Sequence, residues 1–292
     1  MANPAPSRPR VSVVVPFLGG EREAIRLAAQ LRVLDLEPDD ELIVADNTEA
    51  GVAAPALAQV ARVVRAPRER SSYHARNTGA ATAHAEWILF LDADCAPCPD
   101  LLERYFDPSP PAACGIVAGA VSDHPDHDSL LARYTIARNF YAGRDGLQQS
   151  DGDYAPTGNL LVRRAAFEHA GGFVEGIRSA GDVDLCWRIQ RQGWRLERRA
   201  AATAAHRHRE DMRSFCAMLA RYGAGASWLN RRYPGASPRW PLSAYELGRS
   251  AVDAVRHAAR GRREEAAFRL VDALGLVAHN VGYRQSNEVA RS

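Results

Sequence analysis

Two carboxylates follow an apolar run in the first third of the chain. The run Trp87–Leu91 reads WILFL, and Asp92, Ala93 and Asp94 come directly after it. Like charges at this spacing repel each other and are costly to remove from water, so the pair needs a positive partner. Because residues two apart on an extended chain point to the same side, both carboxylates can bind one divalent cation, and oxygen ligands suit Mg²⁺ or Mn²⁺. The alternative is that Asp94 caps a turn that leads to a helix near Pro99.

The segments around these carboxylates predict an α/β fold with a mainly parallel central sheet. Four segments are typical of strands: residues 11–15, 41–46, 61–64 and 87–91. The first of them is an apolar, β-branched run, which indicates a strand buried on both faces. Helical patterns lie between them, over about 21–33 and 72–84. Strands and helices that alternate in this way form right-handed βαβ units, whose ligands bind beyond the carboxyl ends of the strands. We therefore expect one site where Pro16, Asp46 and Asp92 follow or end their strands.

The second half of the chain predicts more helix and shorter strands. Helical patterns cover 130–141, 164–169 and 182–192, and short strands are expected at 160–162, 195–197 and 202–206. The glycine-rich polar segment 143–153 is interpreted as a mobile loop. From Asp211 the sequence is mostly helical, with a break at 233–235. We expect one domain over residues 1–232 and a helical C-terminal extension over 233–292.

The extension contains two amphipathic helical patterns between residues 243 and 283. The apolar positions include Tyr245, Val252 and Val255 in the first pattern, and Leu274 and Val277 in the second. The basic segment 260–263 joins the two. Two interpretations stay open: packing on the domain or in a homodimer, and a peripheral contact with a membrane surface or a lipid acceptor.

The composition is that of an ordinary globular protein of 292 residues, with 46% hydrophobic and 25% charged residues. A net charge of +2 provides no strong field, which argues against a nucleic-acid partner. The five cysteines are odd in number, and Cys95 and Cys98 are interpreted as part of a structural turn and not as a redox or zinc motif. Neither a signal peptide nor a membrane-length apolar run is recognisable, so the expected location is cytoplasmic, at most peripheral at the inner face of the membrane.

Several short patterns occur in an order that resembles the family 2 glycosyltransferases and their GT-A fold. They are VSVVVPFLGG, VADN, HARNTGA, FLDAD, GNLLVRRAAFEHAGGF and GDVDLCWR, and together they extend over about residues 11–210. The resemblance implies an inverting enzyme that moves a sugar from a UDP-, GDP- or dTDP-sugar donor to an acceptor hydroxyl. It implies a saccharide, lipid-linked or small-molecule acceptor and a bound Mg²⁺ or Mn²⁺.

The resemblance assigns one group of residues to the nucleotide. Pro16 and Phe17 would frame the base with backbone groups, and Asp46 would accept hydrogen bonds from the base or the ribose. Arg76 would reach the ribose or the phosphates. From the residues alone, Asp46 is also typical of a turn-former beside Asn47, and the alternative for Arg76 is a structural pairing with Asp46 or Asp92.

A second group would hold the diphosphate and its metal ion. The resemblance places Asp92 and Ala93 near the ribose, and assigns Asp94 and His206 to the metal ion that bridges the two phosphates. An imidazole ligand suits Mn²⁺ better than Mg²⁺. His208 is the alternative to His206, and both residues are also compatible with an exposed basic loop.

The resemblance assigns a third group to the sugar and the acceptor. Gly158 and Asn159 would meet the donor sugar, and Asp182 would be the base that removes the proton of the acceptor hydroxyl. Gly181 stands where the family usually has an acid. Asp182 is also typical of a helix N-cap, a role that is compatible with catalysis, and Asp184 is the alternative base.

Two other functions stay open from the sequence. A sugar-1-phosphate nucleotidyltransferase shares the sheet and the metal, but the stretch PFLGGERE contains only Arg22 where such enzymes carry a basic phosphate loop. A nucleotide-sugar-binding protein without activity is the other, suggested by Gly181. The first strand is not followed by G-x-G-x-x-G, which argues against a dinucleotide-binding Rossmann domain.

Overall fold

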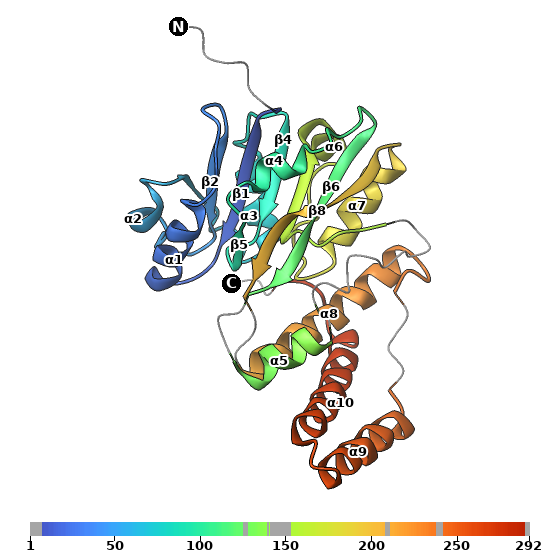
Figure 1. Cartoon of the computed structure of the whole chain (residues 1–292). Coiled ribbons are helices and arrows are strands. Elements are labelled where there is room, and N and C mark those ends of the chain that lie inside the picture. Colours follow the sequence, from blue (N-terminus) through green and yellow to red (C-terminus); the bar gives the residue numbers. More distant parts are fainter. Residues whose placement is uncertain are drawn as a thin grey trace, which may run out of the picture.

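The computed structural model describes residues 8–124, 128–138, 140, 153–207, 211–237 and 242–289. The strands of these residues form one eight-stranded sheet with the order β3-β2-β1-β4-β7-β6-β8-β5 (Figure 1). The predicted loop at 143–153 lies, apart from its last residue, outside the described residues, as does His208.

The first four strands are parallel, as predicted: β1 (Val11–Phe17), β2 (Glu41–Asp46), β3 (Arg62–Arg65) and β4 (Trp87–Leu91). Helices α1 (Glu21–Leu31), α2 (Ala54–Leu57) and α3 (Ser72–Ala80) connect them. Alternate side chains of β1 enter different cores, because successive side chains of a strand point to opposite faces of the sheet. Val13 lies in the core that contains Leu27 of α1, and Val14 lies in the core that contains Tyr73 of α3. Helix α3 approaches β1 closely at Gly79, where a Cβ atom would lie 2.6 Å from Val14 Cγ1.

The other half of the sheet is mixed: β5 (Cys95–Pro97), β6 (Cys114–Asp123), β7 (Asn159–Arg163) and β8 (Arg195–His206). Strand β7 runs antiparallel to β4 and β6, while β6 and β8 are parallel. The two short strands expected at 195–197 and 202–206 are one strand, which contains an irregularity opposite Gly119 and Ala120. Strand β6 was not predicted. Its glycines break the apolar pattern, but Gly119 is needed because a Cβ atom there would overlap with Asn159 and Tyr105.

Short helices α4 (Leu101–Tyr105), α6 (Arg164–His169) and α7 (Gly181–Arg191) cover this half. Four further helices gather at one end of the sheet (Figure 1): α5 (Leu130–Ala137), α8 (Met212–Arg232), α9 (Ala244–Ala259) and α10 (Arg263–Tyr283). A shared core joins Tyr134 of α5, Phe215 of α8 and Phe268 of α10. The predicted boundary at 232/233 falls at the end of α8, yet α8 packs with α10 beyond it, and the division into two parts stays a prediction.

In the part of the chain that has been described, no helix combines the length and the apolar character needed to cross a membrane.

Helices α8 and α10 touch backbone to backbone at two glycines. A Cβ atom on Gly223 of α8 would overlap with the carbonyl oxygen of His279 and lie 2.8 Å from the amide nitrogen of Tyr283. A Cβ atom on Gly282 of α10 would overlap with the carbonyl oxygen of Ala220. Because backbone atoms cannot turn aside as a flexible side chain can, both positions require glycine.

We expect Gly223→Ala to lower the free energy of unfolding by about 1–3 kcal/mol, since the added methyl group forces the two helices apart. Urea denaturation followed by circular dichroism measures the change. Gly248→Ala is the matched control: Gly248 lies in α9 with no atom within 4 Å of the added Cβ. Alanine there should raise stability by roughly 0.5–1 kcal/mol through helix propensity. Equal effects at the two positions would contradict the close crossing.

Candidate active site

A cleft of about 790 Å³ lies beyond the carboxyl ends of β1 and β4. The predicted site residues that line it are Pro16, Phe17, Arg76, Asp92, Ala93, Asp94, Gly158, Asp182 and His206. Asp46 and Asn159, from the same predicted set, do not line it. The sheet therefore gathers residues that are far apart in the sequence at one edge, as the βαβ pattern predicts.

Asp92 has a basic partner that is distant in the sequence. Arg76 projects from α3 and forms a salt bridge through its Nη2 with Asp92 Oδ1. Its guanidinium is buried, lies 5.7 Å from the ring centres of both Tyr73 and Phe173, and donates to Ser72 Oγ at 3.2 Å. The positive charge that the first carboxylate requires is thus supplied by the protein, and the structural interpretation of Arg76 is confirmed beside the cleft.

Asp94 has a different neighbour, the imidazole of His206. Cys95 on β5 pairs with His206 on β8, and this register brings His206 Nε2 to 3.5 Å from Asp94 Oδ2. The ligand atoms of Asp94, Cys95 and His206 all lie within 4.8 Å of one another. Burial raises the pKa of the Cys95 thiol well above its ordinary value, and the charges of Asp94 and Asp92 raise it further.

The donor set of this cluster fits a divalent cation of the Mn²⁺ type. A half-exposed carboxylate and an imidazole at this separation are a ligand pair for such an ion. The Cys95 thiol is a poorer ligand, because it must lose its proton to bind and its surroundings disfavour the thiolate. The amide of Arg207, the residue after His206, donates a hydrogen bond to the Asp94 carbonyl oxygen at 2.9 Å and so links the backbones of the two ligands.

Asp182 also lines the cleft, from the first turn of α7. The predicted N-cap role is wrong: the helix begins at Gly181, its N-cap is Ala180, and Asp182 Oδ1 accepts a hydrogen bond from the adjacent amide of Val183 at 3.0 Å. Ala180 has a left-handed backbone with a φ of 69°, a strained conformation for a residue with a side chain. This turn sets the direction in which Asp182 enters the cleft.

Gly181 is explained by its neighbour Tyr73. The Tyr73 hydroxyl accepts a hydrogen bond from the Gly181 amide at 2.9 Å, and a Cβ atom on Gly181 would lie 2.7 Å from the Tyr73 ring. Burial raises the pKa of Tyr73, and the nearby negative charge of Asp182 raises it further. Glycine is therefore needed at position 181, where the family usually has an acid, because the Tyr73 ring leaves no room for a side chain there.

Asp184, the alternative base, has a structural position. Its carboxylate is fully buried and accepts from Arg188 Nε at 2.7 Å, from Arg232 Nε at 2.7 Å and from the Tyr233 hydroxyl at 2.8 Å. It does not line the cleft. The expected pair with Arg188 is confirmed, and Asp184 ties α7 to the end of α8.

The two predicted residues outside the cleft lining are also engaged inside the protein. Asp46 is buried and accepts hydrogen bonds from the amides of Thr48 and Ala53, and from the Thr48 hydroxyl. The side chain of Asn159 accepts from the Tyr105 hydroxyl at 2.7 Å and donates to two backbone carbonyls. Both residues stand at strand ends, but their side chains point into the protein, and the neighbouring Asn47 and Gly158 line the cleft instead.

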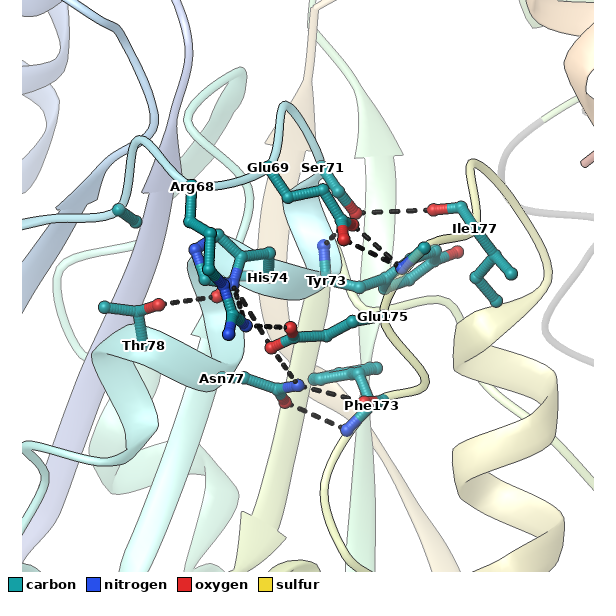
Figure 2. Close-up of polar contacts among 12 residues, drawn as sticks. Arg68, Glu69, Ser71, Tyr73, His74, Asn77, Thr78, Phe173, Glu175 and Ile177 are labelled. Carbon is teal, nitrogen blue, oxygen red and sulfur yellow. Dashed lines mark hydrogen bonds and ion pairs between the residues drawn. The ribbon is translucent and has the colours of Figure 1, made fainter. Parts of the chain in front are cut away.

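A polar network joins α3 and the loop before it to the segment 173–177, as Figure 2 shows. Asn77 of α3 donates to the Phe173 carbonyl at 2.9 Å and accepts from the Phe173 amide at 2.9 Å. His74 and Asn77 both contact Glu175, at 3.2 and 3.0 Å, and Glu69 accepts from the Gly176 amide. Burial alone would raise the pKa of Glu175, but the hydrogen bonds of Asn77 and His74 outweigh it and lower the pKa. Helix α3, which carries Arg76, is thus fixed to the segment that leads to Asp182.

The chain beyond α10 holds the same segment from its other side. Arg178 donates from its amide to the Asn287 carbonyl at 2.8 Å, and Asn287 Nδ2 donates to the Ser179 carbonyl at 2.9 Å. An isolated antiparallel bridge joins Ile177 to Glu288. Residues more than one hundred positions apart therefore position the turn before α7.

Helices α8 and α10, which the sequence did not assign to the site, also contribute residues to the lining of the cleft. These residues are Met218, Arg221, Tyr222, Ala226 and Leu229 of α8, and His279 of α10. The amphipathic pattern of 211–232 and 263–283 indicates helices, but only tertiary packing decides which of their faces meets the cleft. No local signal in the sequence could have identified them.

Comparison with known proteins identifies the family. The model of "Glycosyl transferase family 2" matches residues 12–171, more than half of the chain, so the chain belongs to this family. It is 30% identical over 240 residues to the "Pre-mycofactocin glycosyltransferase" of Mycobacterium tuberculosis (strain ATCC 25618 / H37Rv), a match that covers 78% of this chain and 49% of that protein. It is 27% identical over 197 residues to "Glycosyltransferase AglE" of Haloferax volcanii, with 64% of each chain covered. The chain thus spans about half the length of the mycobacterial relative.

Two solved structures share the fold. The mannosyltransferase PcManGT from Pyrobaculum calidifontis, in complex with GDP-Man and Mn²⁺, matches with a TM-score of 0.64 at 18% identity, covering 94% of this chain and 87% of that one. Glucosyl-3-phosphoglycerate synthase from Mycobacterium tuberculosis, in complex with Mn²⁺, UDP and glucosyl-3-phosphoglycerate, matches with a TM-score of 0.53 at 18% identity, covering 81% and 88%. The predicted GT-A fold is confirmed.

Proposed function

We propose that the protein transfers a sugar from a nucleoside diphosphate donor to an acceptor hydroxyl and inverts the anomeric centre. One observation carries the proposal: the acidic pair Asp92 and Asp94 and the carboxylate of Asp182, which are about ninety positions apart in the sequence, line one cleft. Family membership and the nucleotide-bound complexes of PcManGT and the mycobacterial synthase support this donor class.

On the donor side, Pro16 and Phe17 form the wall for the nucleotide base. Arg76 fixes the carboxylate of Asp92 in place beside the ribose. Asp46 acts on this side by holding residues 48–53 through its hydrogen bonds, and Asn47 presents the surface that meets the nucleotide. In this proposal the base, the ribose and the diphosphate of a bound donor lie along the carboxyl edge of the sheet.

Asp94 and His206 would hold the Mn²⁺ or Mg²⁺ ion. A bound ion supplies stabilisation of the negative charge on the departing diphosphate. The protein itself contributes the register of β5 and β8, which brings the two ligands together, and the Arg207 amide, which fixes the backbone of Asp94.

On the acceptor side, Asp182 takes the proton of the attacking hydroxyl. As the acceptor oxygen forms its bond to the anomeric carbon, the bond to the diphosphate breaks on the opposite face, and the proton remains on the carboxylate. The turn at Ala180 and Gly181 and the network around Glu175 hold this base at a constant position relative to the donor side. Gly158, where a Cβ atom would lie 3.5 Å from Asp92 Oδ2, is assigned to the donor sugar because its missing side chain leaves room beside that carboxylate.

A donor panel tests the proposal directly. The full chain is incubated with UDP-, GDP- and dTDP-sugars, with Mn²⁺ or with Mg²⁺, and both the thermal midpoint and the slow release of nucleoside diphosphate are measured. We expect one nucleotide class to raise the thermal midpoint in the presence of the ion and to be hydrolysed. Stabilisation without any release would indicate a binding protein without activity, and no stabilisation by any donor would overturn the proposal.

A further inference from the structure

Helix α9 turns most of its apolar face to the outside. Figure 1 shows α9 at the end of the molecule, beside α10 and away from the sheet. Ala254 is buried and Leu247 is half-buried, at the edge of this apolar face. Tyr245, Val252 and Val255 remain 74%, 49% and 68% exposed. An amphipathic helix that only closed the core would bury these side chains, because burial of its apolar face is what stabilises such a helix.

Helix α10 adds a second exposed apolar stripe next to α9. Leu270, Leu274, Val277 and Val281 recur at successive turns of the helix and are all exposed. Val281 and Leu242, which lies just before α9, line the same hollow, so the two helices adjoin at this end of the stripe. Of the fourteen large apolar side chains that are exposed in the described residues, seven therefore lie on this helical hairpin, and Leu242 lies just before it.

Arginines border this apolar surface. Arg249 and Arg256 lie four residues after Tyr245 and Val252, and thus beside them on the helix surface. The turn between the two helices adds a cluster of further arginines, Arg260, Arg262 and Arg263. Arg249 pairs with Glu246 at 2.8 Å and Arg256 with Asp253 at 3.4 Å, whereas within the described residues none of the three arginines of the turn forms an ion pair with a carboxylate.

We propose that the α9–α10 hairpin binds peripherally to a lipid surface with anionic headgroups. In this arrangement the apolar side chains enter the boundary between headgroups and acyl chains, while the arginines reach the phosphates. A second copy of the chain fits this surface less well, because a self-complementary contact places the same arginine-bordered face on both subunits. The inference concerns a surface outside the cleft and does not depend on the proposed glycosyl transfer.

Sedimentation with lipid vesicles tests the apolar part of the proposal. The full chain is mixed with vesicles of phosphatidylglycerol and phosphatidylcholine, or of phosphatidylcholine alone. We expect binding to the anionic vesicles, and we expect the double variant Val252→Ser/Val255→Ser to bind about tenfold more weakly because it removes apolar area from the interface. The matched control is Ile25→Ser on α1, whose side chain is 56% exposed away from the hairpin and which should bind as the wild type does.

The arginines are tested in the same assay. The triple variant Arg260→Gln/Arg262→Gln/Arg263→Gln should bind the anionic vesicles on the order of a hundredfold more weakly, and added salt should weaken the wild type more than this variant. Thermal unfolding and donor hydrolysis check that each variant is folded.

Three outcomes would overturn the proposal. The wild type could fail to sediment with anionic vesicles, or the serine variant could bind them as well as the control. Light scattering could also find a dimer that the serine variant converts to a monomer while neither protein binds vesicles, and the surface would then belong to a second copy of the chain.

Discussion

Asp182→Asn should lower the turnover number by roughly 10²–10⁴-fold while donor binding survives. The amide has the shape of the carboxylate but cannot take the proton of the attacking hydroxyl. Because Asp182 comes from α7 whereas Asp92 and Asp94 follow β4, we expect its replacement to leave the donor contacts intact. The rate of nucleoside diphosphate release measures turnover, and the thermal shift caused by the donor measures binding.

The matched control for this variant is Asp184→Asn, two residues further along the same helix. Asp184 is buried among Arg188, Arg232 and Tyr233, so the control should lower the melting temperature and leave the chemistry of the folded enzyme unchanged. Near-normal turnover in Asp182→Asn would show that another group removes the proton. A large loss of turnover in well-folded Asp184→Asn would reassign the base.

Asp94→Asn should abolish the effect of Mn²⁺ on donor binding. It should also reduce the turnover number about as strongly as Asp182→Asn does. One of the two ligands that the cleft offers to the ion is then lost, while the fold keeps its other contacts. Titration calorimetry with Mn²⁺ alone, without donor, reports the loss independently of activity. In the wild type, EDTA should remove activity and an excess of Mn²⁺ or Mg²⁺ should restore it.

An exposed carboxylate nearby provides the control for the metal experiment. Asp100 lies on the surface and pairs with Arg104, so Asp100→Asn should bind Mn²⁺ as the wild type does. Full activity of the wild type in EDTA would contradict a metal-dependent site. Unchanged Mn²⁺ affinity in Asp94→Asn would show that the ion binds elsewhere.

The half of the fold that begins the chain was predictable because its strands are uninterrupted apolar runs. Such runs are typical of strands inside a parallel sheet, as β1, β2 and β4 are, whereas β3 is the edge strand. The polar residues after these strands must then meet at one edge. On this basis Asp92 and Asp94 were predicted at the edge of the sheet, and both line the cleft. Asp182 and His206, which also line the cleft, were pointed to by the family resemblance and not by the strand pattern.

The same reasoning failed where a side chain at a strand end turns inward. The types of Asp46 and Asn159 fit a ligand site, but buried backbone amides and carbonyls required their hydrogen bonds. Strand β6 was missed because its glycines make room for Tyr105 and Asn159, a packing demand that no local pattern reveals. The part of the cleft lining that comes from α8 and α10 depends on tertiary packing, because the close contact of the two helices at Gly223 and Gly282 fixes their relative position.

The contact between Gly181 and Tyr73 has a consequence for how this branch of the family can vary. An acidic side chain at position 181 cannot be accommodated while the phenol occupies the adjoining space, so an acid at position 181 requires a smaller residue at position 73. The two positions form a linked pair, although they lie in separate motifs. A homologue that retains the acid before its base should therefore carry a smaller residue at the position of Tyr73, and this pairing offers a simple marker for sorting sequences into the two types.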